Sequence, residues 1–244
     1  NRTIYTMVNI KRTLMQIGTS TLTGGGERLL LAQVVDLARQ ISELVANGEK
    51  VCVVSSGAIA VGREALGFPD LPKSISAKQM LAAVGQPRLM NVYEQLFEIF
   101  GCKVAQVLLT REDVRDRRRY INARNTINSL LDHEVIPIIN ENDTVATEEI
   151  GIGDNDNLSA LVANLIEADL LVLLTDQEGL FTADPDRSDK AELIHRIDGE
   201  DIPEEIWKSA GGTQNGIGTG GMLTKLQAAE IARRPGTHVV IEKG

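Results

Sequence analysis

Short apolar runs alternate with longer segments of helical periodicity from one end of the chain to the other. Apolar residues recur at spacings of three and four over residues 28–47, as Leu30, Val34 and Leu37 illustrate, and this spacing predicts an amphipathic helix. The next run, residues 51–55, is almost continuously apolar. Such a run is typical of a strand that is buried on both faces of a parallel sheet.

The same alternation recurs over the rest of the chain. The segments typical of strands are 13–17, 51–55, 104–109, 135–139, 170–174 and 238–241, and those with helical spacing are 28–47, 77–100, 119–131, 156–166 and 222–233. Pro87 is expected to kink or split the helix at 77–100. Strands separated by helices predict an α/β fold with a mainly parallel sheet. The irregular segment 183–218 is expected to cover one end of that sheet with loops and short helices.

The segments that directly follow the predicted strands are polar or rich in glycine. They are residues 18–20, 55–58, 140–143 and 175–176. In an open parallel sheet, ligands bind beyond the carboxyl ends of the strands. We therefore expect these four segments to converge on one edge of the sheet and to form the binding site there.

Three glycine-containing loops are suited to bind phosphate. Residues 18–20 and 56–58 each place small residues between a strand and a helical segment, where backbone N–H groups can approach an anion. The third loop, 216–221, precedes a helix that carries Lys225 in its first turns. The sequence of this loop matches G-x-G-x-x-G, but no strand leads into it, so a Rossmann dinucleotide site is not predicted. A strand–glycine–helix turn is also an ordinary connection in α/β proteins, so no single loop decides the question.

Two loops, residues 140–143 and 153–157, are dense in asparagine and aspartate, and the segment between them, 144–152, is a candidate hairpin. Asn and Asp favour turns for local reasons, yet one cluster follows a buried strand directly. Carboxylates and amides together suit a zwitterion, with carboxylates for its ammonium and amide N–H groups for its carboxylates. Mg²⁺ is the competing ligand, but neither cluster has the spacing of a calcium loop, so we expect no metal cage built by protein alone.

Composition narrows the classes of function. The 244 residues are 43% hydrophobic and 24% charged, which is typical of a globular protein. The formal net charge of −9 argues against a general nucleic-acid binder, although a basic pocket for a nucleotide remains compatible with it. No apolar stretch reaches the length of a membrane span and no secretory signal is recognised, so we expect a cytoplasmic protein.

The remaining reactive side chains give weaker signals. Cys52 and Cys102 lie beside apolar runs and are expected to be buried thiols rather than a disulfide or metal site. The three histidines lie outside the candidate loops, so catalysis by histidine is not expected. The arginines within 115–119 are interpreted as a solvated or subunit-facing surface.

Six motifs in this order resemble the amino acid kinase family, and within it the members that phosphorylate the side-chain carboxylate of glutamate. The motifs are Ile17-Gly-Thr-Ser, Ser55-Ser-Gly-Ala-Ile-Ala, Asn140-Glu-Asn-Asp, Gly153-Asp-Asn-Asp-Asn-Leu-Ser-Ala, Leu174-Thr-Asp-Gln-Glu-Gly-Leu and Gly218-Thr-Gly-Gly-Met-Leu-Thr-Lys. The resemblance extends from about residue 13 to residue 241. It implies a three-layer α/β/α sandwich.

The resemblance also implies a reaction and its partners. ATP, with Mg²⁺, would donate its γ-phosphoryl group to L-glutamate, giving glutamyl 5-phosphate as the first step of proline biosynthesis. Proline is then an expected feedback inhibitor, glutamyl phosphate reductase the expected downstream enzyme, and a homo-oligomer (dimer or tetramer) the expected assembly. We expect one kinase domain at residues 13–244 after an extension at 1–12, without the PUA-type domain that many members carry.

Roles for individual residues follow from their positions in the motifs. The residues implied to hold glutamate are Ser56, Gly57, Asp143 and Asn155. Those implied to contact the nucleotide are Thr175, Asp176, Thr219, Gly220, Gly221, Met222, Leu223, Thr224 and Lys225. In catalysis, Lys225 would neutralise the transferring phosphoryl group, Asp156 would orient the lysines, and Gly18 would offer its N–H to the phosphate.

One catalytic position departs from the family. The family's first strand normally ends in a lysine two residues before the matched glycine, where this chain has Gln16. Glutamine can donate a neutral hydrogen bond but carries no charge, and charge-assisted bonds are about twice as strong as neutral ones. If the lysine acts mainly in the transition state, its loss costs about 2.7–4 kcal/mol, or roughly 10²–10³ in rate.

Three hypotheses follow. The first is a glutamate-phosphorylating kinase whose rate is set in part by Gln16. The second is a binding or regulatory protein on the same scaffold that recognises glutamate or proline without turnover. The third is a sister kinase with another acceptor, such as acetylglutamate, aspartate, carbamate or UMP, which the two Asn/Asp loops disfavour.

Overall fold

The fold is built on a six-stranded sheet in the order β3-β4-β2-β1-β5-β6, and all five pairings between neighbours are parallel. The computed structural model describes residues 9–145, 155–182, 189–198, 201–210 and 221–244. The strands are β1 (Arg12–Ile17), β2 (Lys50–Ser55), β3 (Lys103–Leu109), β4 (Val135–Glu141), β5 (Leu170–Thr175) and β6 (His238–Lys243). The predicted α/β fold with a parallel sheet is confirmed.

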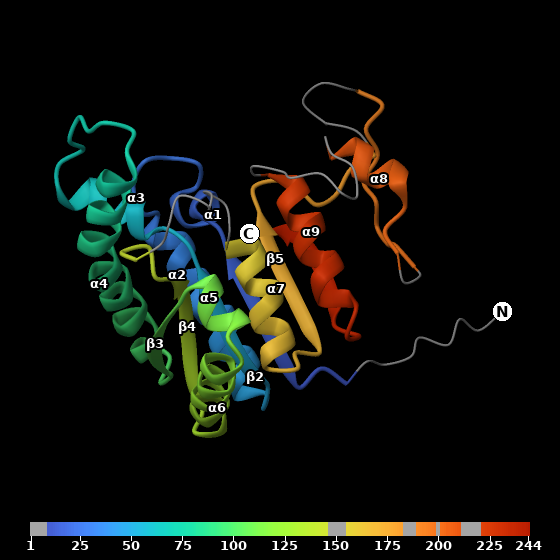
Figure 1. Ribbon diagram of the computed structural model, residues 1–244, viewed down its shortest axis with the longest axis horizontal. Helices are drawn as coiled ribbons and strands as arrows, with labels where there is room; N and C mark the ends of the chain where they lie inside the picture. Colours follow the sequence, from blue (N-terminus) through green and yellow to red (C-terminus); the bar gives the residue numbers. More distant parts are fainter. Residues whose placement is uncertain (1–8, 146–154, 183–188, 199–200, 211–220) are drawn as a thin grey trace.

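Helices cover both faces of this sheet (Figure 1). They are α1 (Thr19–Thr23), α2 (Leu31–Ala46), α3 (Ala58–Ala65), α4 (Ile75–Ile99), α5 (Arg111–Arg115), α6 (Arg117–Asp132), α7 (Asn155–Leu165), α8 (Glu204–Ser209) and α9 (Met222–Arg233). One hydrophobic cluster joins the sheet to α2, α3 and α4, and another joins it to α6, α7 and α9. The implied three-layer α/β/α sandwich is therefore present.

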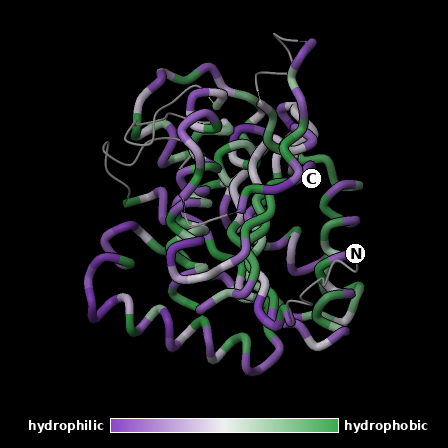
Figure 2. The backbone as a smooth tube through the Cα atoms, turned by 90° about the vertical axis from the view of Figure 1, so that its right-hand side faces the viewer, coloured by the Kyte–Doolittle hydropathy of each residue, from purple (hydrophilic) through white to green (hydrophobic). Residues whose placement is uncertain are grey.

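The strands supply both clusters because successive side chains point to opposite faces of a sheet. In β2, Cys52 and Val54 belong to the cluster under α7, whereas Val51 and Val53 belong to the cluster under α2. The central strands therefore need apolar residues at almost every position, and Figure 2 shows the hydrophobic colour concentrated along them. Burial raises the pKa of the Cys52 thiol, which keeps it protonated and unreactive.

The boundaries of several elements differ from the prediction. Helix α2 begins at Leu31 rather than near residue 28, because the glycine-rich segment before it first closes α1, whose C-cap Gly24 has a left-handed φ of 59°. Pro87 was expected to kink or split helix α4, and the split is wrong, since α4 runs as one helix through Pro87. Pro87 and Ala83, whose carbonyl loses its partner, both lie on the exposed side of the helix, where water can replace that bond. Cys102 is only partly buried.

A third, smaller hydrophobic cluster lies beside β6. Trp207 of α8 is fully buried and packs with Ile202 and with Leu223 and Leu226 of α9. This part of the irregular segment therefore extends the sandwich at its β6 side (Figure 1). Residues 183–188, 199–200 and 211–218 of that segment, and the candidate hairpin at 144–152 beyond residue 145, lie outside the described residues.

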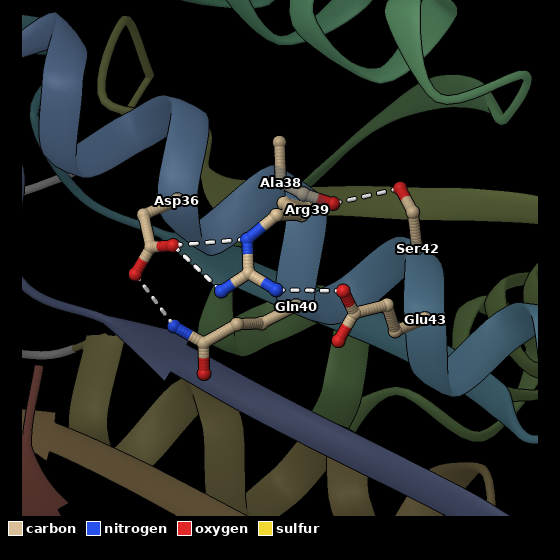
Figure 3. A network of polar contacts seen from close by, with 6 residues as sticks. All are labelled: Asp36, Ala38, Arg39, Gln40, Ser42 and Glu43. Carbon is tan, nitrogen blue, oxygen red and sulfur yellow. Dashed lines mark hydrogen bonds and ion pairs between the residues drawn. The ribbon is translucent and has the colours of Figure 1, made fainter.

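The solvent-facing side of α2 carries a chain of polar contacts (Figure 3). The Arg39 guanidinium donates to Asp36 Oδ1 at 2.8 Å and to Glu43 Oε1 at 2.6 Å, and Gln40 Nε2 donates to Asp36 Oδ2 at 2.9 Å. The hydrogen bond from Arg39 holds the pKa of Asp36 below its usual value. These contacts are fully exposed, so they orient the helix surface and contribute little to folding. None of the helices in the described part of the chain is long and apolar enough to cross a membrane.

Helices α3 and α4 approach each other so closely that only glycine fits at two positions. A Cβ added at Gly85 would lie 1.7 Å from the carbonyl oxygen of Ala58, and one added at Gly62 would lie 2.0 Å from that of Leu81. Both clashes involve backbone atoms, which cannot move aside as a flexible side chain would. The two glycines therefore fix how α4 sits against the start of α3.

We predict that Gly85→Ala destabilises the protein by about 3 kcal/mol or more, at or beyond the upper end of the range for overpacking in a well-packed core. Chemical denaturation monitored by circular dichroism measures the change. Ala83→Ser, at an exposed position of the same helix, is the control and should change stability by less than about 1 kcal/mol. Equal effects of the two substitutions would contradict the close helix contact.

Candidate active site

The polar segments after the strands meet at one edge of the sheet, as the sequence predicts. Parallel register places Ile17 beside Ser55, so β1 and β2 end together. The Ser56 N–H then donates to the Ile17 carbonyl at 2.9 Å, and the Asn142 N–H donates to the Leu109 carbonyl at 2.9 Å. Helix α7 begins beside these ends, because Asn155 bonds directly to the loop after β2.

Asn155 joins the loop that follows β2 to the end of β4. Its Nδ2 lies 2.9 Å from Ser56 Oγ, 2.9 Å from Asn140 Oδ1 and 3.2 Å from the carbonyl oxygen of Ser55. The Oδ1 of Asn155 is buried and has no hydrogen-bond partner among the residues that the structure describes. A buried carbonyl left in this state is costly, so this atom is a natural place for a ligand donor.

Asp143 lies in the turn that follows β4, three residues beyond Asn140. The turn is closed by Asn142, whose carbonyl accepts from the Val145 N–H at 3.1 Å and whose Oδ1 accepts from Thr144 Oγ1 at 2.6 Å. Asp143 is partly buried, and desolvation raises its pKa above the ordinary value. A cationic ligand would reverse this shift, because an opposite charge nearby favours the ionised carboxylate.

On the other side of α7, Asp156 forms a buried ion pair with Lys225 of α9. Lys225 Nζ lies 3.1 Å from Asp156 Oδ1, and both side chains are about nine-tenths buried, at 10% and 9% exposed. Thr224 Oγ1 donates to the second carboxylate oxygen, Oδ2, at 2.6 Å. Both oxygens of Asp156 are thus occupied, and the lysine is held in one orientation rather than extended into solvent. Breaking such a pair from one side leaves a buried charge without compensation.

Gln16, the next-to-last residue of β1, lies between β2 and β5 and is 2% exposed. Its register partners Val54 and Leu173 belong to the cluster under α7 and α9, so Gln16 faces the same layer as Asp156 and Lys225. The Oε1 of Gln16 is buried without a partner in the described part of the chain. The residue therefore brings an uncharged amide to the position where the resemblance implies a lysine.

The ligand-free fold requires glycine at position 57, after β2, but not at position 18, after β1. Gly57 caps α3 with φ of 98°, and an added Cβ would lie 2.9 Å from Leu22 Cδ1, so the fold itself requires glycine there. Gly18 caps α1 with φ of −75°, and an added Cβ would meet its nearest atom only at 3.8 Å. The ligand-free fold thus gives no steric reason for glycine at position 18.

The remaining predicted nucleotide residues are only partly described. Thr175 is buried at the end of β5, and its Oγ1 donates to Asp176 Oδ1 at 3.1 Å. Gly221, Met222 and Leu223 lead into α9, whereas Thr219 and Gly220 lie outside the described residues. Within the described part of the chain, no group of three or more His, Cys, Asp or Glu side chains is arranged to hold a metal ion.

Sequence reasoning missed two residues that support the site from α4. Gln86 Oε1 accepts from Asn140 Nδ2 at 2.9 Å, and the Tyr93 hydroxyl lies 2.7 Å from Ser55 Oγ. Their separation of seven residues, two helical turns, was the available signal, since it places two polar side chains on one face of α4. Without a known partner across the sheet, that spacing carries no functional meaning in the sequence.

Comparison with known proteins assigns this fold and site to a class. The chain matches the amino acid kinase family over residues 11–243 and therefore belongs to that family. It is 55% identical to the glutamate 5-kinase of Sodalis glossinidius over 97% of its length, and 55% identical to that of Yersinia pestis over 95%. These matches cover 64% and 62% of the two relatives, so the chain spans less than two thirds of their length.

Solved structures agree on the fold. A carbamate kinase from Giardia lamblia bound to AMP-PNP superposes with a TM-score of 0.65 at 18% identity, covering 97% of this chain and 93% of that one. An isopentenyl phosphate kinase from T. acidophilum, solved as a product complex, gives 0.64 at 18% identity, covering 95% and 91%. At this identity the likeness establishes the shared architecture only.

The raised pKa of Asp143 leads to a stability prediction. A carboxyl whose pKa is higher in the folded chain gives its full stabilisation below the unfolded pKa and loses it as pH rises through the folded pKa. Asp143→Asn should therefore raise the melting temperature of the ligand-free protein at pH 8, by an amount that shrinks as the pH falls towards the ordinary value of 3.8. Thermal melts at several pH values, with exposed Asp70→Asn as control, measure this. A gain that is independent of pH would contradict desolvation as the cause.

Proposed function

We propose that this chain is the kinase domain of an enzyme that transfers the γ-phosphoryl group of ATP to the side-chain carboxylate of L-glutamate, the first step of proline biosynthesis. The observation that carries the proposal is the start of α7. Asn155 there contacts Ser56 after β2 and Asn140 near the end of β4, and the next residue, Asp156, pairs with Lys225 of α9. A small zwitterion bound beside Asn155, on one side of α7, would thus lie next to the buried Lys225 on the other side of that helix.

The acceptor side suits glutamate. Ser56, Asp143 and Asn155 offer a hydroxyl, a carboxylate and an amide within adjoining loops, and Gly57 opens α3 beside them. Asp143 gains an ionic partner when an ammonium arrives, which compensates its desolvation. Two curated relatives at 55% identity are named glutamate 5-kinase, which supports this acceptor over those of the sister kinases.

The transfer itself needs little covalent chemistry. A glutamate carboxylate oxygen forms a bond to the γ-phosphorus, the bond from that phosphorus to the bridging oxygen breaks, and its electron pair leaves with ADP. The carboxylate is already ionised at neutral pH, so no general base is required. What the protein must supply is in-line placement and stabilisation of the charge on the transferring group. Lys225, which pairs with Asp156, is the residue we assign to that task, together with the Gly18 N–H.

Thr175, Asp176 and residues 219–225 are assigned to the nucleotide. Mg²⁺ is expected to arrive with ATP, because this ion keeps several waters and usually binds through substrate phosphates and only one or two carboxylates. Both oxygens of Asp156 already have partners, so we assign no protein ligand to Mg²⁺. A homo-oligomer, inhibition by proline and a downstream glutamyl phosphate reductase belong to the same proposal and rest on the family resemblance.

Gln16 gives the test of this proposal. Gln16→Lys places a positive charge at the buried end of β1, on the face that carries Lys225, and should raise kcat by roughly 10²–10³ because it adds a charged donor to the transition state. A coupled assay of glutamate-dependent ADP release measures both proteins. Gln16→Met, similar in length but uncharged and unable to donate, should show no gain. If neither this chain nor its lysine variant releases ADP when glutamate is added, the proposal fails.

Gly18 provides an independent test of where the phosphate lies. Gly18→Ala fits the ligand-free fold and should leave stability unchanged or raise it by about 0.4–1 kcal/mol. If the phosphate approaches the Gly18 N–H closely, the added methyl group displaces it, and kcat/KM for ATP should fall by roughly 10², the effect of moving a reacting group by about 1 Å. Gly57→Ala is the contrasting variant, which should lose stability through its positive φ. Full activity in Gly18→Ala would place the phosphate elsewhere.

A further inference from the structure

Four side-chain amides from four elements form a continuous chain that ends at the acceptor side of the site. Asn155 Nδ2 at the start of α7 donates to Asn140 Oδ1 near the end of β4, and Asn140 Nδ2 donates to Gln86 Oε1 on α4, each at 2.9 Å. Gln86 Nε2 then donates to Gln106 Oε1 on β3, also at 2.9 Å. Every amide therefore points the same way, from the buried site outwards to the exposed edge of the sheet.

The direction of this chain is fixed by backbone groups, whose roles as donor or acceptor cannot change. The Glu141 N–H, a donor only, points at Asn140 Oδ1 at 2.9 Å and identifies that atom as oxygen. The Ser55 carbonyl, an acceptor only, faces Asn155 Nδ2 at 3.2 Å and identifies that atom as nitrogen. Amide orientations are assigned from such networks, and here both ends agree. Gln86 must then present its oxygen to Asn140.

These orientations determine which atom of the Asn155 amide can bind a ligand. Its nitrogen is surrounded by three acceptors, and its buried oxygen is left without a partner among the described residues. Asn155 can therefore offer a ligand an acceptor but not a donor. On an amino acid, the group that needs an acceptor is the ammonium, since both carboxylates need donors.

Helix α4 is a rigid support for this chain. Gly85, directly before Gln86, is locked against the Ala58 carbonyl at the start of α3, so the backbone there has no room to shift. Two turns later, Tyr93 is fully buried with its hydroxyl 2.7 Å from Ser55 Oγ. Burial raises the pKa of Tyr93 to about 12, which keeps that hydroxyl neutral. One face of α4 thus supports both residues that flank Asn155, namely Ser55 and Asn140.

We propose that Gln86 is a positioning residue for substrate specificity: acting through Asn140, it holds the Asn155 amide with Oδ1 towards the site, where it binds the ammonium group of the acceptor. This inference rests on the proposed function, because it takes Asn155 to contact glutamate. Without the Gln86 oxygen, Asn140 keeps its bond from the Glu141 N–H but loses the acceptor for its Nδ2, so its side chain is held less firmly beside Asn155. Asn155 then offers the ammonium a less defined acceptor.

The test compares L-glutamate with glutarate, which has both carboxylates but lacks the ammonium group. Isothermal titration calorimetry of the full chain gives the dissociation constant of each, and ADP binding serves as a reference for the nucleotide side. Gln86→Met keeps the length of the side chain and removes its hydrogen bonds. We expect it to weaken glutamate binding roughly tenfold, the effect of one lost hydrogen bond to a charged group, while glutarate and ADP binding change less than about twofold.

Two further variants separate positioning from general disturbance. Gln86→Glu retains an oxygen facing Asn140 Nδ2 and should keep the preference for glutamate over glutarate. Gln40→Leu removes an amide from the exposed face of α2, a helix that carries no member of the amide chain and where Gln40 Nε2 donates to Asp36, and should change the binding of neither ligand. If Gln86→Met is too unstable to titrate, Gln86→Ala removes the same acceptor from this partly buried position and takes its place.

The outcomes distinguish the positioning role of Gln86 from the proposed function. If the unaltered chain prefers glutamate and Gln86→Met keeps the same ratio of affinities, the positioning role is overturned while the proposed function stands. If the unaltered chain binds neither glutamate nor ADP, the proposed function fails and this inference fails with it. Loss of the preference in Gln86→Met, together with its retention in Gln86→Glu, supports the assignment.

Discussion

The first turn of α7 is held from two sides, and the arrangement of the candidate site depends on this constraint. Asn155 bonds to Ser55, Ser56 and Asn140 on the side of β2 and β4, while Asp156 pairs with Lys225 on α9. Because the two residues are consecutive, the distance between the acceptor side and the buried lysine is set by one peptide unit. Phosphoryl transfer requires mainly such fixed placement of two reactants.

Glutamine at position 16 is compatible with the fold but is expected to lower the rate of phosphoryl transfer. The residue is buried in a central strand, and its neighbours in the sheet are apolar on both sides. A neutral amide is easier to bury there than an ammonium, since desolvation disfavours the charged form. Glutamine in place of the family's lysine also removes a charge from the face that carries Lys225. The fold thus tolerates glutamine at this position, and the proposed chemistry is the property that it affects.

Much of the fold was predictable from the sequence because the strands are buried on both faces. Short, continuous apolar runs such as 51–55, bounded by polar residues and glycine, are typical of buried parallel strands, and parallel register then brings their polar ends together. The boundaries were less predictable, because α1 forms inside a glycine-rich loop and Pro87 lies on an exposed face of α4 where its missing N–H does little harm.

The candidate site was predictable residue by residue only where a motif marks it. The loops that contain Ser56 and Asn155 were identified from the sequence, but the hydrogen bond between them joins residues that are 99 positions apart. Gln86 could not be assigned a role from its spacing to Tyr93 alone, because that role depends on an amide chain across three other elements. Long-range polar contacts of this kind depend on side-chain orientation, which a pattern of apolar and polar positions does not contain.

In the proposed enzyme, an amino acid acceptor and a nucleotide meet at the start of α7. A crystal structure of this chain with L-glutamate, ADP and a planar phosphoryl mimic such as aluminium fluoride tests it most directly. We expect the glutamate ammonium within hydrogen-bonding distance of Asn155 Oδ1, and the mimic between the glutamate side-chain carboxylate and ADP, in contact with Lys225 Nζ. Glutamate bound with a carboxylate against the Asn155 amide, or a mimic remote from Lys225, would contradict it.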